Sequence, residues 1–170
     1  MTLLAVAPPV SPRRAQMASI VGQVDGVIGR LNAWGAPLLQ LAIRLWIAKV
    51  FFTSGLTKIQ DWDTTVLLFA EEYKVPLLSP DVAAALGTTF ELGMPVLLAV
   101  GLFSRLAALP LLGMALVIQF VLGAANPAYD SVEHVYWMFL LLTIVVHGPG
   151  RLSLDGVLRG LCRNGKRNAT

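Results

Sequence analysis

Four long apolar segments constrain the fold of this chain more than any other feature of its sequence. They cover residues 37–58, 82–103, 106–125 and 131–148. A helix needs about 20 residues to cross the ~30 Å hydrocarbon core of a bilayer. The first three segments reach that length, whereas the fourth is centred on residues 135–146 and needs its flanks to do so. The sequence therefore predicts an all-α fold, a polytopic membrane four-helix bundle.

The composition agrees with a small membrane protein. Of the 170 residues, 56% are hydrophobic and only 14% are charged, whereas about a quarter of a soluble domain is charged. We expect residues 36–150 to form the transmembrane domain, between a cytoplasmic amphipathic arm (1–35) and a basic cytoplasmic tail (151–170). In the arm and the tail, apolar residues recur at helical spacing beside arginines, which is typical of helices that lie at a membrane interface.

The charges between the segments predict how the chain crosses the membrane. Acidic residues prevail in the connections 58–81 and 126–134, whereas basic residues prevail in the arm, at the hairpin with Arg105 and in the tail. Because Lys and Arg collect in cytoplasmic loops, we expect a multi-pass protein of the bacterial inner (plasma) membrane with both termini cytoplasmic. The same separation argues against nucleic-acid binding, although the net charge is +3.

The first outer connection carries a helical pattern. Four of its residues recur at i, i+4, i+7 and i+11, namely Trp62, Val66, Phe69 and Tyr73. An aspartate before them can cap a helix. We therefore expect a short helix on the outer surface, with its aromatic residues toward the bilayer or the mouth of the bundle. Glu71 and Glu72 should face water.

Ionisable residues lie inside the apolar segments, where an unpaired charge costs at least ~2.5–3.5 kcal/mol. Counting 1.5 Å per residue from the predicted ends places Lys49 and Glu91 at one depth, roughly 18 Å in. We therefore expect Glu91 to pair with Arg44 or Lys49 inside the bundle. Lys58 ends the first segment, where its simplest role is an anchor that reaches the outer interface. The buried charges serve either as polar glue between helices or as a ligand or proton site, and the residues alone leave both open.

Six polar residues are candidates for a ligand site, namely Arg44, Lys49, Lys58, Glu91, Gln119 and His134. Nearby aromatic residues either floor a quinone pocket or serve as packing, namely Trp46, Phe51, Phe52, Phe90, Phe120 and Trp137. Haem is not expected, because His134 and His147 lie roughly 20 Å apart on one helix. With a single cysteine, Cys162, no metal site is expected either. No dinucleotide fingerprint, P-loop or nucleophile elbow appears.

Several short motifs together resemble the DoxX family of small four-helix bacterial membrane proteins. The resemblance covers residues 38–156. It rests on an arginine early in the first helix, Gly-x-x-Lys at its end, a glutamate in the second helix, Gly-Leu-x-x-Arg at the next hairpin, and a Gly-x-Gly turn before Ser-Leu-Asp. These motifs correspond to Arg44, Gly55 with Lys58, Glu91, Gly101-Leu102 with Arg105, Gly148 with Gly150, and Ser153-Leu154-Asp155.

The resemblance implies a role beside redox enzymes, since family members are associated with quinol oxidase, thiosulfate–quinone oxidoreductase or oxidative-stress complexes. It suggests an integral membrane subunit of a quinone-linked system, with quinone as ligand and a soluble or membrane redox partner. The alternative is a non-enzymatic membrane anchor or transport component, in copper or modified-peptide handling. A third reading is a conductor of protons or small solutes. The sequence leaves open the oligomeric state and whether the protein is a catalyst.

Overall fold

The computed structural model describes residues 12–167 and divides the chain into two units, Met1–Ala36 and Pro37–Thr170. In the first unit, α1 (Pro12–Arg30) is followed by a π-helical turn, η1 (Leu31–Gly35). The apolar side chains of α1 are exposed, among them Ile20, Val24 and Val27. The predicted helix is therefore present, and it begins earlier than the apolar pattern.

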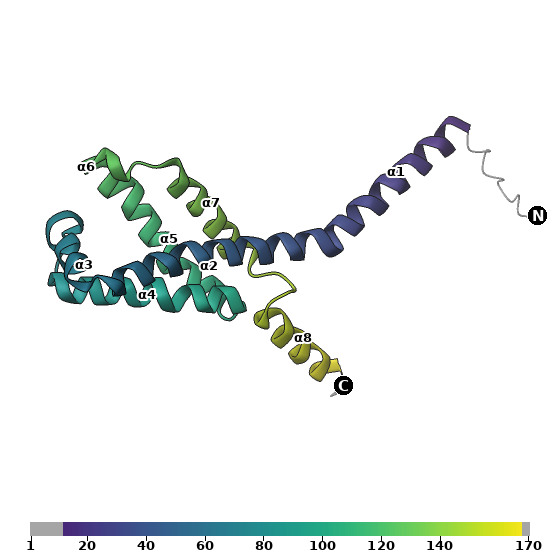
Figure 1. The fold of residues 1–170 in the computed structure, drawn as a ribbon. Coiled ribbons are helices and arrows are strands. Elements are labelled where there is room, and N and C mark those ends of the chain that lie inside the picture. The colour runs from purple at the N-terminus through teal and green to yellow at the C-terminus, as the bar shows by residue number, and fades with distance from the viewer. Residues whose placement is uncertain (1–11, 168–170) are drawn as a thin grey trace, which may run out of the picture. The chain divides into compact units, whose positions relative to one another are not determined.

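The second unit holds the membrane-spanning helices (Figure 1). They are α2 (Ala36–Gln60), α4 (Pro80–Val100), α5 (Ser104–Leu116) with its continuations η3 (Val117–Leu122) and α6 (Gly123–Ala125), and α7 (Val132–His147). Among the described residues, three helical stretches are long and apolar enough to cross a membrane, namely Gln16–Gln60, Pro80–Val100 and Ser104–Ala125. The helix α7 has 16 residues and a length of ~24 Å, so the fourth span is short, as its sequence predicted.

Shorter elements close the two ends of the second unit. At the end that we name the outer end lie α3 (Trp62–Leu68), η2 (Phe69–Tyr73) and η4 (Pro127–Tyr129). At the opposite end, which we name the inner end, a turn joins α4 to α5. The helix α8 (Leu154–Arg167) also begins at this end, after α7. Figure 1 shows α3 and α8 at these opposite ends. The expected all-α membrane bundle is confirmed.

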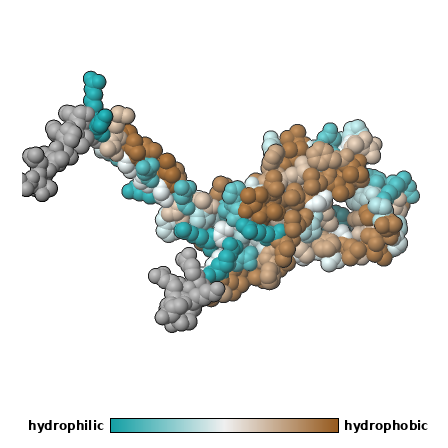
Figure 2. All heavy atoms as spheres, turned by 180° about the vertical axis from the view of Figure 1, so that it is seen from behind, coloured by the Kyte–Doolittle hydropathy of each residue, from teal (hydrophilic) through white to brown (hydrophobic). Residues whose placement is uncertain are grey.

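The core of the bundle consists of small and apolar side chains. Alanines on α5 allow close approach of α4 and α7, which both pack against α5. The buried residues of this cluster are Ile47, Ala48, Phe51, Leu98, Ala107, Ala108, Leu111, Ala115, Leu141 and Ile144. Large apolar side chains also cover the outside of the bundle, as the brown surface in Figure 2 shows. Such a surface suits contact with lipid.

The register between α2 and α4 differs from the one expected. Arg44 lies beside the last turn of α4, where it donates to the carbonyls of Leu98 and Ala99. Gly55 packs directly on α4, because a Cβ there would lie 2.9 Å from Leu92 Cδ2. Lys58 therefore reaches the depth of Glu91, roughly 14 Å from the inner end of α4. The expectation that Lys58 anchors the helix at the outer interface is therefore wrong. The helix α2 starts beyond the inner end of α4, so Lys58 lies beside the middle of α4 and does not reach its outer end.

Candidate functional site

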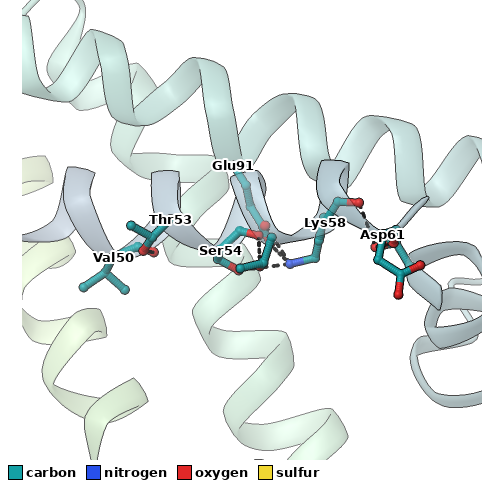
Figure 3. Close-up of polar contacts among 8 residues, drawn as sticks. Val50, Thr53, Ser54, Lys58, Asp61 and Glu91 are labelled. Carbon is teal, nitrogen blue, oxygen red and sulfur yellow. Dashed lines mark hydrogen bonds and ion pairs between the residues drawn. The ribbon is translucent and has the colours of Figure 1, made fainter. Parts of the chain in front are cut away.

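An ion pair joins the last turn of α2 to the middle of α4. Lys58 Nζ lies 2.7 Å from Glu91 Oε2 and 2.9 Å from Oε1, so it donates to both carboxylate oxygens. Ser54 Oγ, one turn earlier on α2, accepts a third hydrogen bond at 3.0 Å. Figure 3 shows the three side chains converging from the two helices. The side chains are 12% and 9% exposed, which leaves the pair within reach of a bound molecule.

This pair forms part of the wall of a cavity of about 580 Å³. That volume falls in the range of small-molecule sites, which are mostly apolar with a few placed polar groups. The polar lining residues are Ser54, Lys58, Tyr73, Glu91, Tyr129 and His134. Apolar residues such as Phe90, Met114 and Trp137 form most of the remaining wall. A Cβ on Gly113 would meet no atom within 4 Å, so this glycine leaves room in the cavity.

The outer connection covers the cavity. Asp61 caps α3 by accepting from the Thr64 amide at 3.1 Å, and the hydrogen bonds of Thr64 lower the pKa of Asp61. Phe69 is 8% exposed, and its Cζ would lie 2.9 Å from a Cβ on Gly87 of α4. Glu71 and Glu72 are exposed. The predicted helix is thus confirmed, and Phe69 and Tyr73 lie at the mouth of the bundle as predicted. Trp62 is exposed outside the cavity lining, so its predicted orientation stays a prediction.

Two tyrosines link this connection to the one between α5 and α7. The ring of Tyr73 lies edge-on to Phe69 at 4.8 Å and to Tyr129 at 6.1 Å. The hydroxyl of Tyr129 donates to Glu72, and this hydrogen bond raises the pKa of Tyr129. Burial, followed by the charges of Glu91 and Glu72, raises the pKa of Tyr73 to about 12. Both phenols are therefore neutral at physiological pH.

His134 is held with a defined ring orientation at the edge of the cavity. Its Nδ1 lies 3.0 Å from the carbonyl oxygen of Tyr129. A carbonyl only accepts, so Nδ1 carries the proton in this contact, and the Nε2 of a neutral ring is an acceptor. The ring also lies edge-on to Trp137 at 4.9 Å. The cavity thus combines a cationic donor, a carboxylate and an imidazole.

Arg44 is completely buried at the inner end, far from Glu91. It donates to Leu98 O at 3.2 Å, to Ala99 O at 3.4 Å and to the carbonyl of Leu152. The predicted pairing of Glu91 with Arg44 or Lys49 is wrong, because Lys58 takes that place and Lys49 is exposed on the surface of α2. The carbonyls at the end of α4 can accept from Arg44 because no further turn of helix follows, and Leu98 O also accepts from the Gly101 amide at 3.1 Å.

The inner end is a structural junction between α4, α5 and α8. The carboxylate of Asp155 accepts from the amides of Phe103 and Ser104 at 3.0 and 3.1 Å, and it caps α5. The Asp155 amide donates in turn to Gly101 O at 2.9 Å. Gly101 has φ +78° and lies against the Arg44 guanidinium, so no side chain fits there. These contacts serve the packing and capping of the three helices.

The cavity gathers three of the six candidate residues, namely Lys58, Glu91 and His134. Gln119 lies on η3 and donates to Asp130 at 2.5 Å, outside the cavity lining. Among the aromatic candidates, Phe90 and Trp137 line the cavity and Phe51 packs on Trp137 at 5.8 Å. The exposed Trp46, Phe52 and Phe120 do not line it.

Sequence reasoning missed Ser54, Tyr129 and Gly113 as lining residues. Ser54 lies one turn before Lys58 on the same helical face, so the spacing of four residues was an available signal. Tyr129 lies in a short turn, and Gly113 is a glycine within an apolar helix. Neither has a periodic signal that would have identified it.

Comparison with known proteins supports the motif-based resemblance. The DoxX family model matches residues 39–124, half of the chain. The match includes α2 from residue 39 onward, α4, α5 and nearly all of the α5 continuation, and therefore both partners of the ion pair. No curated protein and no solved structure matches the chain.

Proposed function

Because this chain belongs to the DoxX family, we propose that it is a membrane subunit of a quinone-linked oxidoreductase system and binds a quinone head group in its cavity. The observation that carries the proposal is the Lys58–Glu91 pair in the wall of an otherwise apolar cavity of about 580 Å³. A quinone ring is flat and apolar and has two polar oxygens on opposite edges. It therefore needs apolar walls with a few hydrogen-bonding groups, which this cavity supplies.

The polar groups suit both redox states of such a ligand. The O–H of Ser54 is a donor that suits a carbonyl oxygen of a quinone. The three N–H donors of Lys58 are already used by Glu91 and Ser54, so Lys58 would contribute its positive charge beside that oxygen. Glu91 and the Nε2 of His134 are acceptors that suit the hydroxyl groups of a quinol. Trp137 and Phe90 offer aromatic surfaces for the ring. The bound ring would supply the redox chemistry, and the chain would hold it and order its hydrogen bonds.

The distribution of charge along the chain indicates on which side of the membrane the cavity lies. The connections at the outer end are acidic, whereas the α4–α5 turn and α8 carry arginines. By the preference of Lys and Arg for the cytoplasmic side, we place the cavity in the outer half of a bacterial inner membrane. The termini would then be cytoplasmic. A redox partner that exchanges electrons with the ring would dock at the outer end.

Binding can be measured through tryptophan fluorescence, because Trp137 lines the cavity. A short-chain ubiquinone titrated into the purified full-length protein in mild detergent should quench this fluorescence saturably. Gly113→Leu should abolish saturable quenching, because it fills the cavity without altering the ion pair. Gly93→Leu is the matched control, since Gly93 is exposed on α4 and a Cβ there meets no atom within 4 Å.

Two further variants separate the pair from general charge effects. Lys58→Met should weaken quinone binding, whereas Lys49→Met, on the exposed side of the same helix, should leave it unchanged. Quinone extracted with solvent from the wild-type protein, and not from Gly113→Leu, would provide an independent readout. Equal quenching of wild-type protein and Gly113→Leu would refute the proposal.

A further inference from the structure

A second site lies at the inner end, between the start of α5 and α8. It is a notch of about 300 Å³, separate from the cavity with the ion pair. Its lining consists of Phe103, Arg105, Leu106, Pro149, Asp155, Leu158 and Arg159. We refer to it as the inner notch. Two cations thus stand beside three large apolar side chains.

Both arginines of the inner notch are held by backbone carbonyls. Arg105 Nη2 donates to Val146 O at 3.1 Å, and its Nη2 would lie 3.4 Å from a Cβ on Gly148, so the guanidinium rests on this glycine. Arg159 Nε donates to Asp155 O at 3.1 Å. Each guanidinium has five N–H donors, so several remain free. The backbone therefore orients both guanidinium groups and leaves some of their N–H donors available to a ligand.

In the described part of the chain, neither arginine lies within 4.0 Å of a carboxylate oxygen, although Asp155 also lines the inner notch. Within the described side chains, the ion pair at 4.0 Å or less is that of Lys58 with Glu91. The carboxylate of Asp155 is already used, because it accepts from the amides of Phe103 and Ser104 and from the Ser104 hydroxyl. The inner notch therefore presents two guanidinium groups that suit an anion with several oxygens, such as a phosphate.

The apolar residues of the inner notch indicate the source of that phosphate. Phe103, Leu106 and Leu158 are 62%, 65% and 50% exposed, which is unfavourable for a site that takes a soluble anion from water. Leu109, one turn beyond Leu106 on the spanning helix α5, is also exposed. An apolar strip therefore leads from the arginines along the lipid-facing side of the bundle. The combination of cations and apolar strip matches a phospholipid at a membrane interface.

We propose that the inner notch binds an anionic phospholipid. Its phosphate would lie between Arg105 and Arg159, and an acyl chain would lie along Leu106 and Leu109. Such a lipid would join α8 to the bundle at the membrane surface. The inference is independent of quinone binding, because the two sites share no residue.

Native mass spectrometry of the full-length protein can test the lipid site. The protein in detergent would be mixed with equal amounts of phosphatidylglycerol and phosphatidylcholine, and the bound lipid would be counted. Wild-type protein should retain phosphatidylglycerol over phosphatidylcholine. Each basic residue near a membrane surface strengthens such binding roughly fivefold. Arg159→Gln should therefore reduce retention about fivefold, and Arg105→Gln/Arg159→Gln should reduce it further.

Arg13→Gln/Arg14→Gln is the matched control, because it removes two exposed cations from α1 and should leave retention unchanged. Arg159→Gln alone keeps the test decisive if the double variant does not fold, since the hydrogen bond that Arg159 makes within the described residues is to its own helix. The inference is overturned by wild-type retention in Arg159→Gln, by an equal loss in the control, or by equal retention of phosphatidylcholine. Displacement of phosphatidylglycerol by equimolar inorganic phosphate would instead indicate a soluble anion site and also overturn it.

Discussion

Lys58 Nζ lies 2.7 Å from Glu91 Oε2, and this contact both joins α2 to α4 and forms a wall of the cavity. A buried charge is costly without a partner, so the pair is needed once either residue is present. Ser54 satisfies a further donor of Lys58. The three N–H donors of Lys58 are then all used, whereas the Glu91 carboxylate in the cavity wall keeps lone pairs that can accept from a ligand. The pair is therefore important for stability, and its carboxylate is available to a ligand.

The first prediction concerns the energy of this pair. Glu91→Gln or Lys58→Met alone should lower the free energy of unfolding by about 3 kcal/mol, because each leaves a buried charge without its partner. The double variant should lose less than the sum of the two, since neither charge is then stranded. Equilibrium unfolding in mixed detergent micelles measures the three values.

Lys49→Met provides the control for that cycle. Lys49 is exposed on α2, so its combination with Glu91→Gln should be additive. Additive losses for Lys58 with Glu91, or coupling of Lys49 with Glu91, would contradict the observed pairing.

The second prediction concerns the contact of α2 with α4 at Gly55. Gly55→Ala would place a Cβ 2.9 Å from Leu92 Cδ2 and 3.2 Å from the Glu91 carbonyl carbon. Because overpacking typically costs 1–3 kcal/mol, this variant should unfold more easily by about 2 kcal/mol. Gly93→Ala, on the open side of α4, should change stability by less than about 1 kcal/mol. The same unfolding assay compares them, and equal stabilities would show that the helices are not in close contact at Gly55.

The spans and the outer helix could be predicted from sequence because periodicity and length report directly on helices. The partner of Glu91 could not, because depth was counted from residue 37 as the start of the span. The register is instead fixed by tertiary contacts of Arg44 with Leu98 and Leu152. Similarly, the motifs identified the family, but they do not reveal what Arg44 and Lys58 contact. Arg44 binds backbone carbonyls at the inner end, whereas Lys58 pairs with Glu91 in the wall of the cavity.

The third prediction follows from the buried position of Arg44. Arg44→Lys should destabilise the protein by roughly 3 kcal/mol, because an ammonium lacks the planar fork that reaches carbonyls on two segments. The loss should be additive with that of Glu91→Gln, since Arg44 and Lys58 lie roughly 21 Å apart along α2. Limited proteolysis should also cleave the chain before α8 faster in this variant, because the contact with Leu152 is lost. Unchanged cleavage and stability would exclude Arg44 as the link between α4 and α8.

The last prediction uses the phenol of Tyr73, which lies outside the spanning helices. Burial and the charges of Glu91 and Glu72 raise its pKa to about 12, from an ordinary value near 10. Since the folded pKa is the higher one, its contribution to stability is complete below about pH 10 and is lost as the pH rises through about 12. The outer connection should therefore loosen in this alkaline window.

Tyrosinate absorbance at 295 nm can isolate this group, because the difference between wild-type protein and Tyr73→Phe reports Tyr73 alone. The difference titration should have its midpoint near pH 12. In a Glu91→Gln background the midpoint should move toward lower pH, because the second-largest cause of the shift is removed. It should not return to an ordinary value, since burial by the cavity wall is the largest cause and remains. A midpoint near pH 10 in both backgrounds would mean that Tyr73 is open to water and does not close the mouth of the cavity.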